Sequence, residues 1–295
     1  MATTPPIDPP NVPRRSGDGM APGRLIRAAI LLVPLLVLVV WTLIPFLVTI
    51  SVSFKTKGET FANYRLIPEN PTTVAYQQVL GDPNFRGAFW NSVVVGVGTA
   101  VVSLALAVPA AYAFARFRFR GRHLLLLFLL LPRLVPSLGL MVPLYRLAAA
   151  TGQLDKRTTL IVVYSGMLLP LAVWLLVGFF QQIPRDIEEA ANVDGATLAD
   201  RMRYIVLPLA APALITVVVL AFREAWNEFA LVLVLTSSPG KRTLPFELFM
   251  LQAGEGIANF PGEAAFALIT VLPFILVYTR IERYVVAGIT AGSSK

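Results

Sequence analysis

Six long apolar runs constrain this chain more than any other feature of its sequence. They cover approximately residues 25–52, 88–115, 123–148, 158–181, 204–234 and 264–284. Each run is long enough for the roughly 20 residues that a membrane-spanning helix needs. Only helices and closed barrels satisfy every backbone hydrogen bond in lipid, and these runs are too long and too continuous for barrel strands. The sequence therefore predicts an all-α, multi-pass membrane protein with six transmembrane helices.

The composition agrees with this class. Hydrophobic residues make up 56% of the 295 positions and charged residues only 14%, whereas charged residues form about 25% of an average soluble domain. The chain has no cysteine and a single histidine, His123. We therefore expect no disulfide framework and no metal site, and we interpret His123 as an interfacial residue beside an arginine-rich loop.

Basic residues are concentrated on one side of the predicted membrane topology. Four arginines lie between positions 14 and 27, four between 116 and 122, and three between 185 and 203. With six spans, all three groups fall on the same side, which the positive-inside rule identifies as the cytoplasm. Both termini are then cytoplasmic. Because topology explains the net charge of +8, we expect no nucleic-acid binding.

The chain divides into a tail and one large domain. Residues 1–22 are rich in proline and poor in large apolar side chains, which is typical of a disordered segment. Residues 23–295 form the predicted transmembrane domain. Within it, the segment of about 184–208 is polar although apolar runs flank it, and the topology makes it a cytoplasmic loop.

Local signals predict that this loop is a pair of short helices. Pro184 suits the start of the first helix, and Gly195 suits its end because glycine readily adopts the left-handed conformation. Thr197 and Asp200 have the spacing of a capping box that starts the second helix. The small residues Ala190 and Ala191 allow another surface to approach closely, which predicts a docking surface. The alternative is an amphipathic helix lying on lipid, but the first helix lacks large apolar anchors and a basic face.

The loop also carries a motif at fixed spacing. Its members are Glu189, Ala190, Ala191, Gly195, Ile205, Leu207 and Pro208. This pattern resembles the signature loop of permease subunits of ATP-binding-cassette importers. Two further segments, Trp226–Phe229 and Val286–Gly292, resemble the carbohydrate branch of that family, and within it the smaller maltose-type permease subunit.

The resemblance implies a division of labour between subunits. The loop would form coupling helices that sit in a cleft of an ATPase dimer, with Glu189 making polar contacts and Gly195 providing the bend. The tail residues Thr290, Ala291 and Gly292 would also reach the ATPase. A second homologous permease, an extracytoplasmic solute-binding protein and a carbohydrate substrate complete the implied set of partners in a bacterial cytoplasmic membrane.

The sequence favours nucleotide binding on a partner subunit. A phosphate loop needs Gly, four residues, then Gly-Lys-Ser/Thr. The nearest fragment, 239–243, has Arg242 where serine or threonine belongs and Leu235 where the first glycine belongs. We therefore expect no catalytic residues and no cofactor on this chain, with ATP and magnesium on the partner ATPase.

Polar residues inside the fifth apolar run are candidates for function, because such residues are costly in a membrane. Trp226, Asn227 and Glu228 are candidates for the solute pathway, since an indole ring stacks on sugars and an amide hydrogen-bonds to them. On one helix, Glu224 and Glu228 would share a face and need a neutralising cation. Candidate ion-pair partners are Arg133 and Arg223. The alternative is a structural ion-pair network, and the length of the 204–234 run predicts a bend near these residues.

The preferred hypothesis is a permease subunit of an ATP-driven, binding-protein-dependent sugar importer. The same machinery importing glycerol phosphate, peptide or polyamine is one alternative. A stand-alone secondary transporter is another, and it predicts inverted repeats and broken midplane helices. A membrane enzyme is disfavoured because the sequence has no convergent histidine, cysteine and aspartate cluster.

Overall fold

The computed structural model describes residues 22–254 and 258–291, and the side chains of 30–254, 258–276 and 279. Every regular element in these ranges is helical. In chain order they are α1 (Pro22–Ser53), α2 (Lys57–Ala62), α3 (Val74–Gly81), α4 (Pro83–Arg116), α5 (Arg122–Leu130), η1 (Leu131–Leu134), α6 (Ser137–Ala150), α7 (Arg157–Gln182), α8 (Arg185–Val193), α9 (Leu198–Arg201), η2 (Met202–Val206), α10 (Leu207–Leu209), α11 (Ala211–Asn227), α12 (Ala230–Leu235), η3 (Pro239–Lys241), α13 (Leu244–Gly254) and α14 (Phe260–Ala291). The predicted all-α class is confirmed, whereas the predicted tail 1–22 lies outside the described residues except for Pro22.

Residues 1–49 and 50–295 form two compact units. The described part of the first unit is a single apolar helix. Three helical stretches are long and apolar enough to cross a membrane on their own: 30–53, α4 and α7. Two bent pairs of helices raise the number of candidate spans to five, and the apolar stretch Phe260–Leu276 at the start of α14 is shorter. A multi-span helical membrane protein is therefore confirmed.

The bends occur where proline interrupts the helical hydrogen bonds. The helices at 122–134 and 137–150 meet at 92°. Between them Val135 is extended (ψ 120°), because the α conformation is disfavoured for a residue that precedes proline, here Pro136. The helices at 198–209 and 211–227 meet at 77°, where Pro212 has no N–H to donate to the preceding turn.

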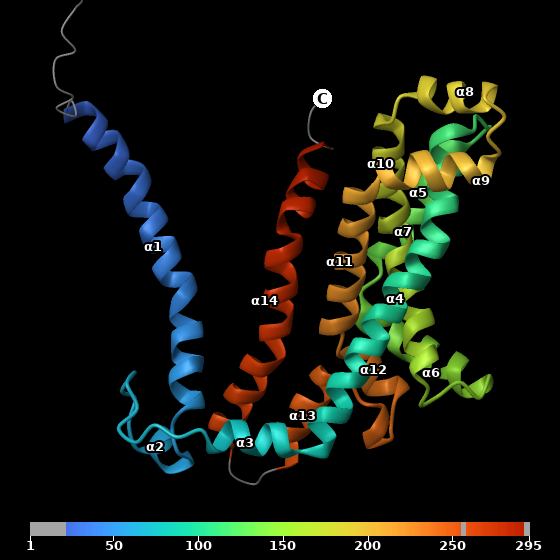
Figure 1. Cartoon of the computed structure of the whole chain (residues 1–295). Helices are drawn as coiled ribbons and strands as arrows, with labels where there is room; N and C mark the ends of the chain where they lie inside the picture. The colour runs from blue at the N-terminus through green and yellow to red at the C-terminus, as the bar shows by residue number, and fades with distance from the viewer. Residues whose placement is uncertain (1–21, 255–257, 292–295) are drawn as a thin grey trace, which may run out of the picture. The chain divides into compact units, whose positions relative to one another are not determined.

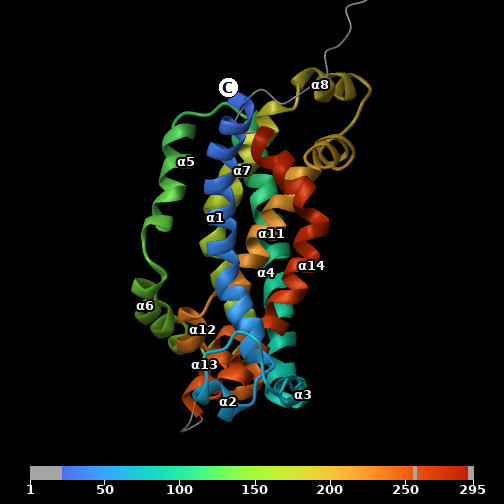
Figure 2. The ribbon, with the colours of Figure 1, turned by 90° about the vertical axis from the view of Figure 1, so that its left-hand side faces the viewer.

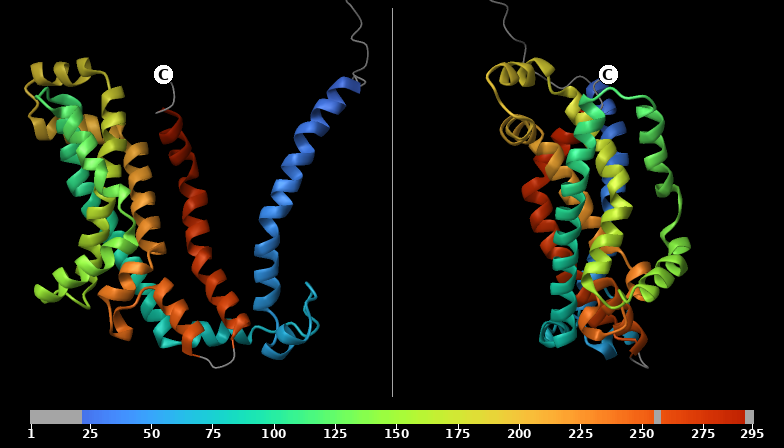
Figure 3. Two further views of the ribbon diagram at one scale, coloured as in Figure 1. Left: turned by 180° about the vertical axis from the view of Figure 1, so that it is seen from behind. Right: turned by 90° about the vertical axis from the view of Figure 1, so that its right-hand side faces the viewer.

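The main hydrophobic core of the second unit lies where α4, α7 and α11 run side by side (Figure 1 and Figure 3). Small buried residues of α4, including Ala107 and Ala111, face larger residues of α7, including Leu176 and Phe180. Small residues let helix backbones approach closely, which is how helices associate in lipid, where no hydrophobic driving force acts between them.

A buried asparagine holds a loop against α4. Asn91 is fully buried, and its amide nitrogen donates to the carbonyl oxygens of Gly240 (3.0 Å) and Arg242 (2.8 Å). The loop contains η3 and the rest of the 239–243 fragment that partly resembles a phosphate loop. Two of its carbonyl groups, those of Gly240 and Arg242, accept hydrogen bonds from Asn91, and residues 239–241 form a short 3-10 turn just before α13.

Asp155 connects two loops at the end of the second unit opposite α8. Its backbone is left-handed (φ 61°), which aspartate and asparagine tolerate better than most residues. Its carboxylate accepts hydrogen bonds from the amides of Ser237 and Ser238, both at 3.0 Å, and from the Ser238 hydroxyl. Burial raises the pKa of Asp155, but these hydrogen bonds lower it more, so the pKa lies below its usual value.

The Asp155→Asn variant should lose pH-dependent stability and keep the loop backbone. A carboxyl group whose folded pKa is depressed stabilises the fold above its unfolded pKa of about 3.9, and this contribution is lost as the pH falls through the folded pKa. The melting temperature of the wild-type protein in detergent should therefore fall more steeply below about pH 4 than that of the variant. Parallel pH profiles for the two proteins would contradict this assignment.

Candidate functional site

The polar loop between α7 and α11 is the candidate functional site. Ile183, which precedes Pro184, is extended (ψ 121°), and α8 begins at the residue after Pro184. Asp186 and Glu188 lie in the first turn of α8, where negative charge is favourable to the helix dipole. Figure 1 and Figure 2 show α8 lying across the ends of the long helices rather than along them. The loop thus presents a helix at one end of the core.

Gly195 ends α8 as predicted. Its φ is +86°, in the left-handed region. The amide of Ala196 donates to the carbonyl of Ala191 (2.9 Å), and the amide of Gly195 donates to that of Asn192 (3.2 Å). These two bonds form a Schellman motif, which satisfies the last carbonyl groups of the helix. The chain therefore reverses sharply after α8.

The second helix starts with the predicted capping box. The Thr197 hydroxyl accepts from the Asp200 amide (3.2 Å), and the Asp200 carboxylate accepts from the Thr197 amide (3.0 Å). The Thr197 hydroxyl also donates to this carboxylate, and these hydrogen bonds lower the pKa of Asp200. Helix α9 continues through a π-helical turn, η2, into α10. The segment thus has two short helices separated by a bend.

Replacing Gly195 should impair the loop through its backbone alone. A Cβ at this position would meet no heavy atom within 4 Å, so no clash is expected. An L-residue in the left-handed conformation costs about 1–2 kcal/mol. Transport should therefore decrease in the order glycine, Gly195→Asn, Gly195→Ala, because asparagine tolerates this conformation better than alanine. Uptake rates at equal amounts of membrane-inserted protein test the order, and equal rates would show that the bend is dispensable.

The motif residues divide into an exposed face and a packed face. Glu189 and Ala190 are exposed, and Ala191 is half-buried. On the second helix, Ile205 and Leu207 are half-buried, Pro208 is exposed, and Val206 between them is fully buried in the main core. The exposed face of α8 is available to another protein, and the second helix anchors the loop to the bundle.

Sequence reasoning missed the role of Glu188. It is the one buried residue of α8. Its carboxylate lies 2.5 Å from Nη2 of Arg116 and accepts a hydrogen bond from the Tyr112 hydroxyl (2.7 Å). No local signal distinguishes Glu188 from Glu189, because the residues that bury Glu188 lie more than 70 positions earlier in the chain.

The intramembrane charges are arranged differently from the prediction. Glu224 has the two expected neighbours: its carboxylate is 3.7 Å from Arg133 and 3.8 Å from Arg223. The expectation that Glu224 and Glu228 share a helix face is wrong, because α11 ends at Asn227 and Glu228 is extended (ψ 124°). This break matches the predicted bend.

Within the part of the chain that the structure describes, Glu228 accepts hydrogen bonds and forms no ion pair with a cation. Its carboxylate accepts from the Tyr164 hydroxyl (2.9 Å) and from the amides of Leu231 (3.0 Å) and Val232 (3.2 Å). The two amides belong to the first turn of α12, whose N–H groups have no partner within the helix. Glu228 therefore stabilises the restart of the helix after the break.

Trp226 is packed inside the protein. It is 6% exposed, its ring stacks on Phe222 at 5.1 Å, and Phe89 meets it edge-on at 5.9 Å. The indole faces that we expected to contact a sugar are thus occupied in this conformation. Asn227 is exposed, with its amide nitrogen donating to the Arg223 carbonyl (2.8 Å), and its contact with solute stays a prediction.

The predicted ATPase-contacting tail is only partly described. Thr290 and Ala291 form the end of α14, their side chains are outside the described set, and Gly292 lies outside the described residues. Within the described part of the chain, no three histidine, cysteine, aspartate or glutamate side chains are grouped to hold a metal ion.

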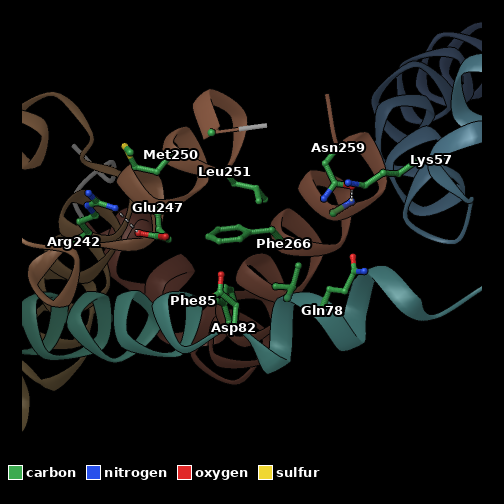
Figure 4. Close-up of a pocket in the computed structure, with 13 residues that line it drawn as sticks. Lys57, Gln78, Asp82, Phe85, Arg242, Glu247, Met250, Leu251, Asn259 and Phe266 are labelled. Atoms are coloured by element: carbon green, nitrogen blue, oxygen red, sulfur yellow. Dashed lines mark hydrogen bonds and ion pairs between the residues drawn. The ribbon is translucent and has the colours of Figure 1, made fainter. Parts of the chain in front are cut away.

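A cavity of about 520 Å³ lies at the opposite end of the second unit from α8. Figure 4 shows its mixed lining of charged, amide and apolar side chains, which include Lys57, Gln78, Asp82, Phe85, Arg242, Glu247, Met250, Leu251, Asn259 and Phe266. Glu247 is buried and lies 3.6 Å from Arg242. Burial raises the pKa of Glu247, Arg242 opposes this shift, and Asp82 adds to it, so the net pKa is raised.

Taken together, the described residues form a bundle of apolar helices with a polar two-helix loop across one end, which is the architecture of a helical membrane protein. Residues 103–291 match the family described as binding-protein-dependent transport system inner membrane component. The chain belongs to this family.

Individual relatives cover nearly the whole chain. The trehalose transport system permease protein SugB of Mycobacterium tuberculosis (strain CDC 1551 / Oshkosh) is 36% identical over 265 residues, which are 86% of this chain and 93% of SugB. The trehalose/maltose transport system permease protein MalG of Thermococcus litoralis is 30% identical over 92% of this chain and 98% of MalG. The sulfoquinovosyl glycerol transport system permease protein SmoH of Agrobacterium fabrum is 35% identical over 93% of this chain and 94% of SmoH.

A solved structure shows the same fold. The crystal structure of a bacterial ABC transporter involved in the import of the acidic polysaccharide alginate has a chain that superposes with a TM-score of 0.80. The match covers 90% of this chain and 98% of that chain at 23% sequence identity.

Proposed function

We propose that this chain is the permease subunit of an ATP-driven, binding-protein-dependent sugar importer. The observation that carries the proposal is the loop of α8 to α10. It displays the Glu-Ala-Ala motif on an exposed helix, and a left-handed glycine and a capping box set its bend. The loop transmits closure of an ATPase dimer to the membrane helices, which then expose the solute pathway to alternate sides.

The relatives support a sugar as cargo. Two of those described above are named for trehalose, and a third for a sugar-substituted glycerol. Within this proposal, Asn227 and Glu228 border the solute pathway at the break between α11 and α12. The importer chemistry needs no cofactor on this chain, since ATP and magnesium bind to the ATPase.

The proposal includes six spans with both termini in the cytoplasm. The two bent helix pairs and α14 complete the set begun by α1, α4 and α7. The loop of α8 to α10 then faces the ATPase, and the cavity shown in Figure 4 faces the solute-binding protein. A second homologous permease covers apolar surface of this chain inside the bilayer of the cytoplasmic membrane.

A mild-detergent purification from native membranes tests the proposal. An ATPase with a phosphate loop and a second multi-span chain should co-purify in fixed ratio and be identified by mass spectrometry. Proteoliposomes containing this complex and its binding protein should take up radiolabelled trehalose or maltose, used here as probe sugars, only when ATP is present inside. Recovery of the chain alone, or uptake without ATP, would favour a secondary transporter instead.

A further inference from the structure

The coupling helix α8 is attached to the membrane helices through a single buried side chain. Of its residues, only Glu188 is buried, at 5% exposure. Asp186 and Glu189, on the same helix, are exposed. A force applied to α8 therefore reaches the bundle through the two chain ends of the loop, through the contacts of Glu188 and through one hydrogen bond from Arg185 to α4.

Those contacts are charge-assisted and shielded from solvent. Arg116 donates from Nε to the Glu188 carboxylate at 2.7 Å, and Nη2 lies 2.5 Å from the same oxygen. The Tyr112 hydroxyl donates to the other oxygen at 2.7 Å. The side chains of Arg116 and Glu188 are only 9% and 7% exposed. Hydrogen bonds between charged groups are stronger and more directional than neutral ones, and burial strengthens them further.

Arg116 and its neighbours also hold the loop at its first residues. Arg116 donates to the carbonyl of Ile183 at 3.1 Å, and Arg185 donates to the carbonyl of Ala115 at 3.4 Å. Ile183 immediately precedes Pro184, the residue that caps α8. Two hydrogen bonds thus hold the start of α8 to the last turn of α4, one donated by an α4 side chain and one by an α8 side chain.

The partners of Glu188 sit where α4 packs against α7 in the main core. Tyr112 contacts Phe180 of α7 and Phe117 edge-on, with ring centroids 6.4 and 6.3 Å apart. Ala111 and Ala115 of α4 belong to the same buried core as Phe180. A displacement of α4 at this point is therefore shared with α7.

We propose that Glu188, Arg116 and Tyr112 form a rigid anchor that makes α8 and α4 move as one body, so that ATPase closure shifts the α4–α7 pair. This inference rests on the proposed function of α8. It assigns two adjacent glutamates to opposite tasks: Glu189 faces the ATPase, and Glu188 faces the membrane helices. Glu188 acts as a positioning residue, since it contacts neither nucleotide nor solute.

Distance measurements between spin labels test the anchor in the complete transporter. The chain has no native cysteine, so labels can be placed through Asn192→Cys on α8 and Leu106→Cys on α4, both exposed positions. The distance distribution should stay narrow and unchanged when a non-hydrolysable ATP analogue and Mg²⁺ are added. With Glu188→Ala added, the distribution should shift and broaden on nucleotide binding. A distribution unchanged by Glu188→Ala would overturn the anchor.

A double variant separates coupling from folding. Glu188→Ala leaves Arg116 as an unpaired buried charge, which destabilises a protein strongly. Glu188→Ala combined with Arg116→Ala removes both charges, so the complex should assemble normally. Uptake of the probe sugar should nevertheless fall severalfold while ATP hydrolysis continues, because α8 can then move without carrying α4 with it. Wild-type uptake by the assembled double variant would overturn the anchor and leave the proposed function intact. Failure of the wild-type chain to bind an ATPase would overturn the anchor and the proposed function together.

Discussion

Transport should collapse by about 100-fold or more in the Glu189→Lys variant, while the protein still inserts into the membrane. Glu189 is exposed on α8, and among the described residues it forms no ion pair with the rest of this chain. Its charge is therefore available to a partner. Disrupting one member of a desolvated charge pair costs about 2–5 kcal/mol, and each 1.4 kcal/mol is about a factor of ten in affinity.

Two measurements separate loss of coupling from loss of folding. Exposed surface substitutions usually change stability by less than about 0.5 kcal/mol, so the melting temperature of Glu189→Lys should match that of the wild type. Co-purification of the ATPase should decrease together with uptake. Glu189→Gln keeps the shape of the side chain and removes its charge, so its uptake rate should lie between the rates of the wild type and of Glu189→Lys. Normal uptake by Glu189→Lys would remove the coupling role of this residue.

The second large effect is expected at the contact between α4 and α11. A Cβ at Gly96 would lie 2.7 Å from a ring carbon of Phe222, which is closer than two carbon atoms approach in a folded protein. Phe222 stacks on Trp226, which limits how far its ring can turn away. Gly96→Leu should therefore force α11 away from α4. Overpacking of this kind costs about 1–3 kcal/mol, and the folded yield and the melting temperature in detergent should both fall.

Gly166 offers a matched control. It lies in α7, it is exposed, and a Cβ there would meet nothing within 4 Å. Leucine has a helix propensity close to that of alanine, and both exceed glycine by nearly 1 kcal/mol. Gly166→Leu should therefore be neutral or stabilising for the isolated chain. Equal melting temperatures for the two leucine variants would show that the α4–α11 contact is loose enough to absorb the added side chain.

Local chemistry made much of the loop predictable. Pro184 restricts the backbone before α8, Gly195 takes a conformation that other residues adopt at a cost, and Thr197 pairs with Asp200 within one turn. Each signal involves residues close together in the chain. The apolar runs likewise predicted the long helices, because lipid requires every backbone group to bond within its own helix.

Features that depend on distant residues were not predictable. Glu188 is buried because Arg116 and Tyr112 reach it from α4. Trp226 is packed because Phe89 of α4 meets its ring. The prediction that Glu224 and Glu228 share a helix face was wrong for a different reason. Residues four apart lie on one face only along an unbroken helix. The helix stops at Asn227 without a proline or glycine, and the Glu228 carboxylate supplies the hydrogen bonds that permit the break.

The break at Glu228 gives the two halves of one chain segment different main neighbours. Helix α11 packs mainly on α4 and α14, α12 packs mainly on α6, and both also contact α7. The two halves are joined by a pivot whose backbone is not held by a continuous helix, so a rotation of α12 need not be repeated in α11. Within the proposed function, a solute pathway bordered by this break can then change its width while the α4–α11 contact stays the same. Cargo selection and energy transmission thereby become separable traits. Substitutions around the pivot can accommodate new sugars and leave α8 and its loop unchanged.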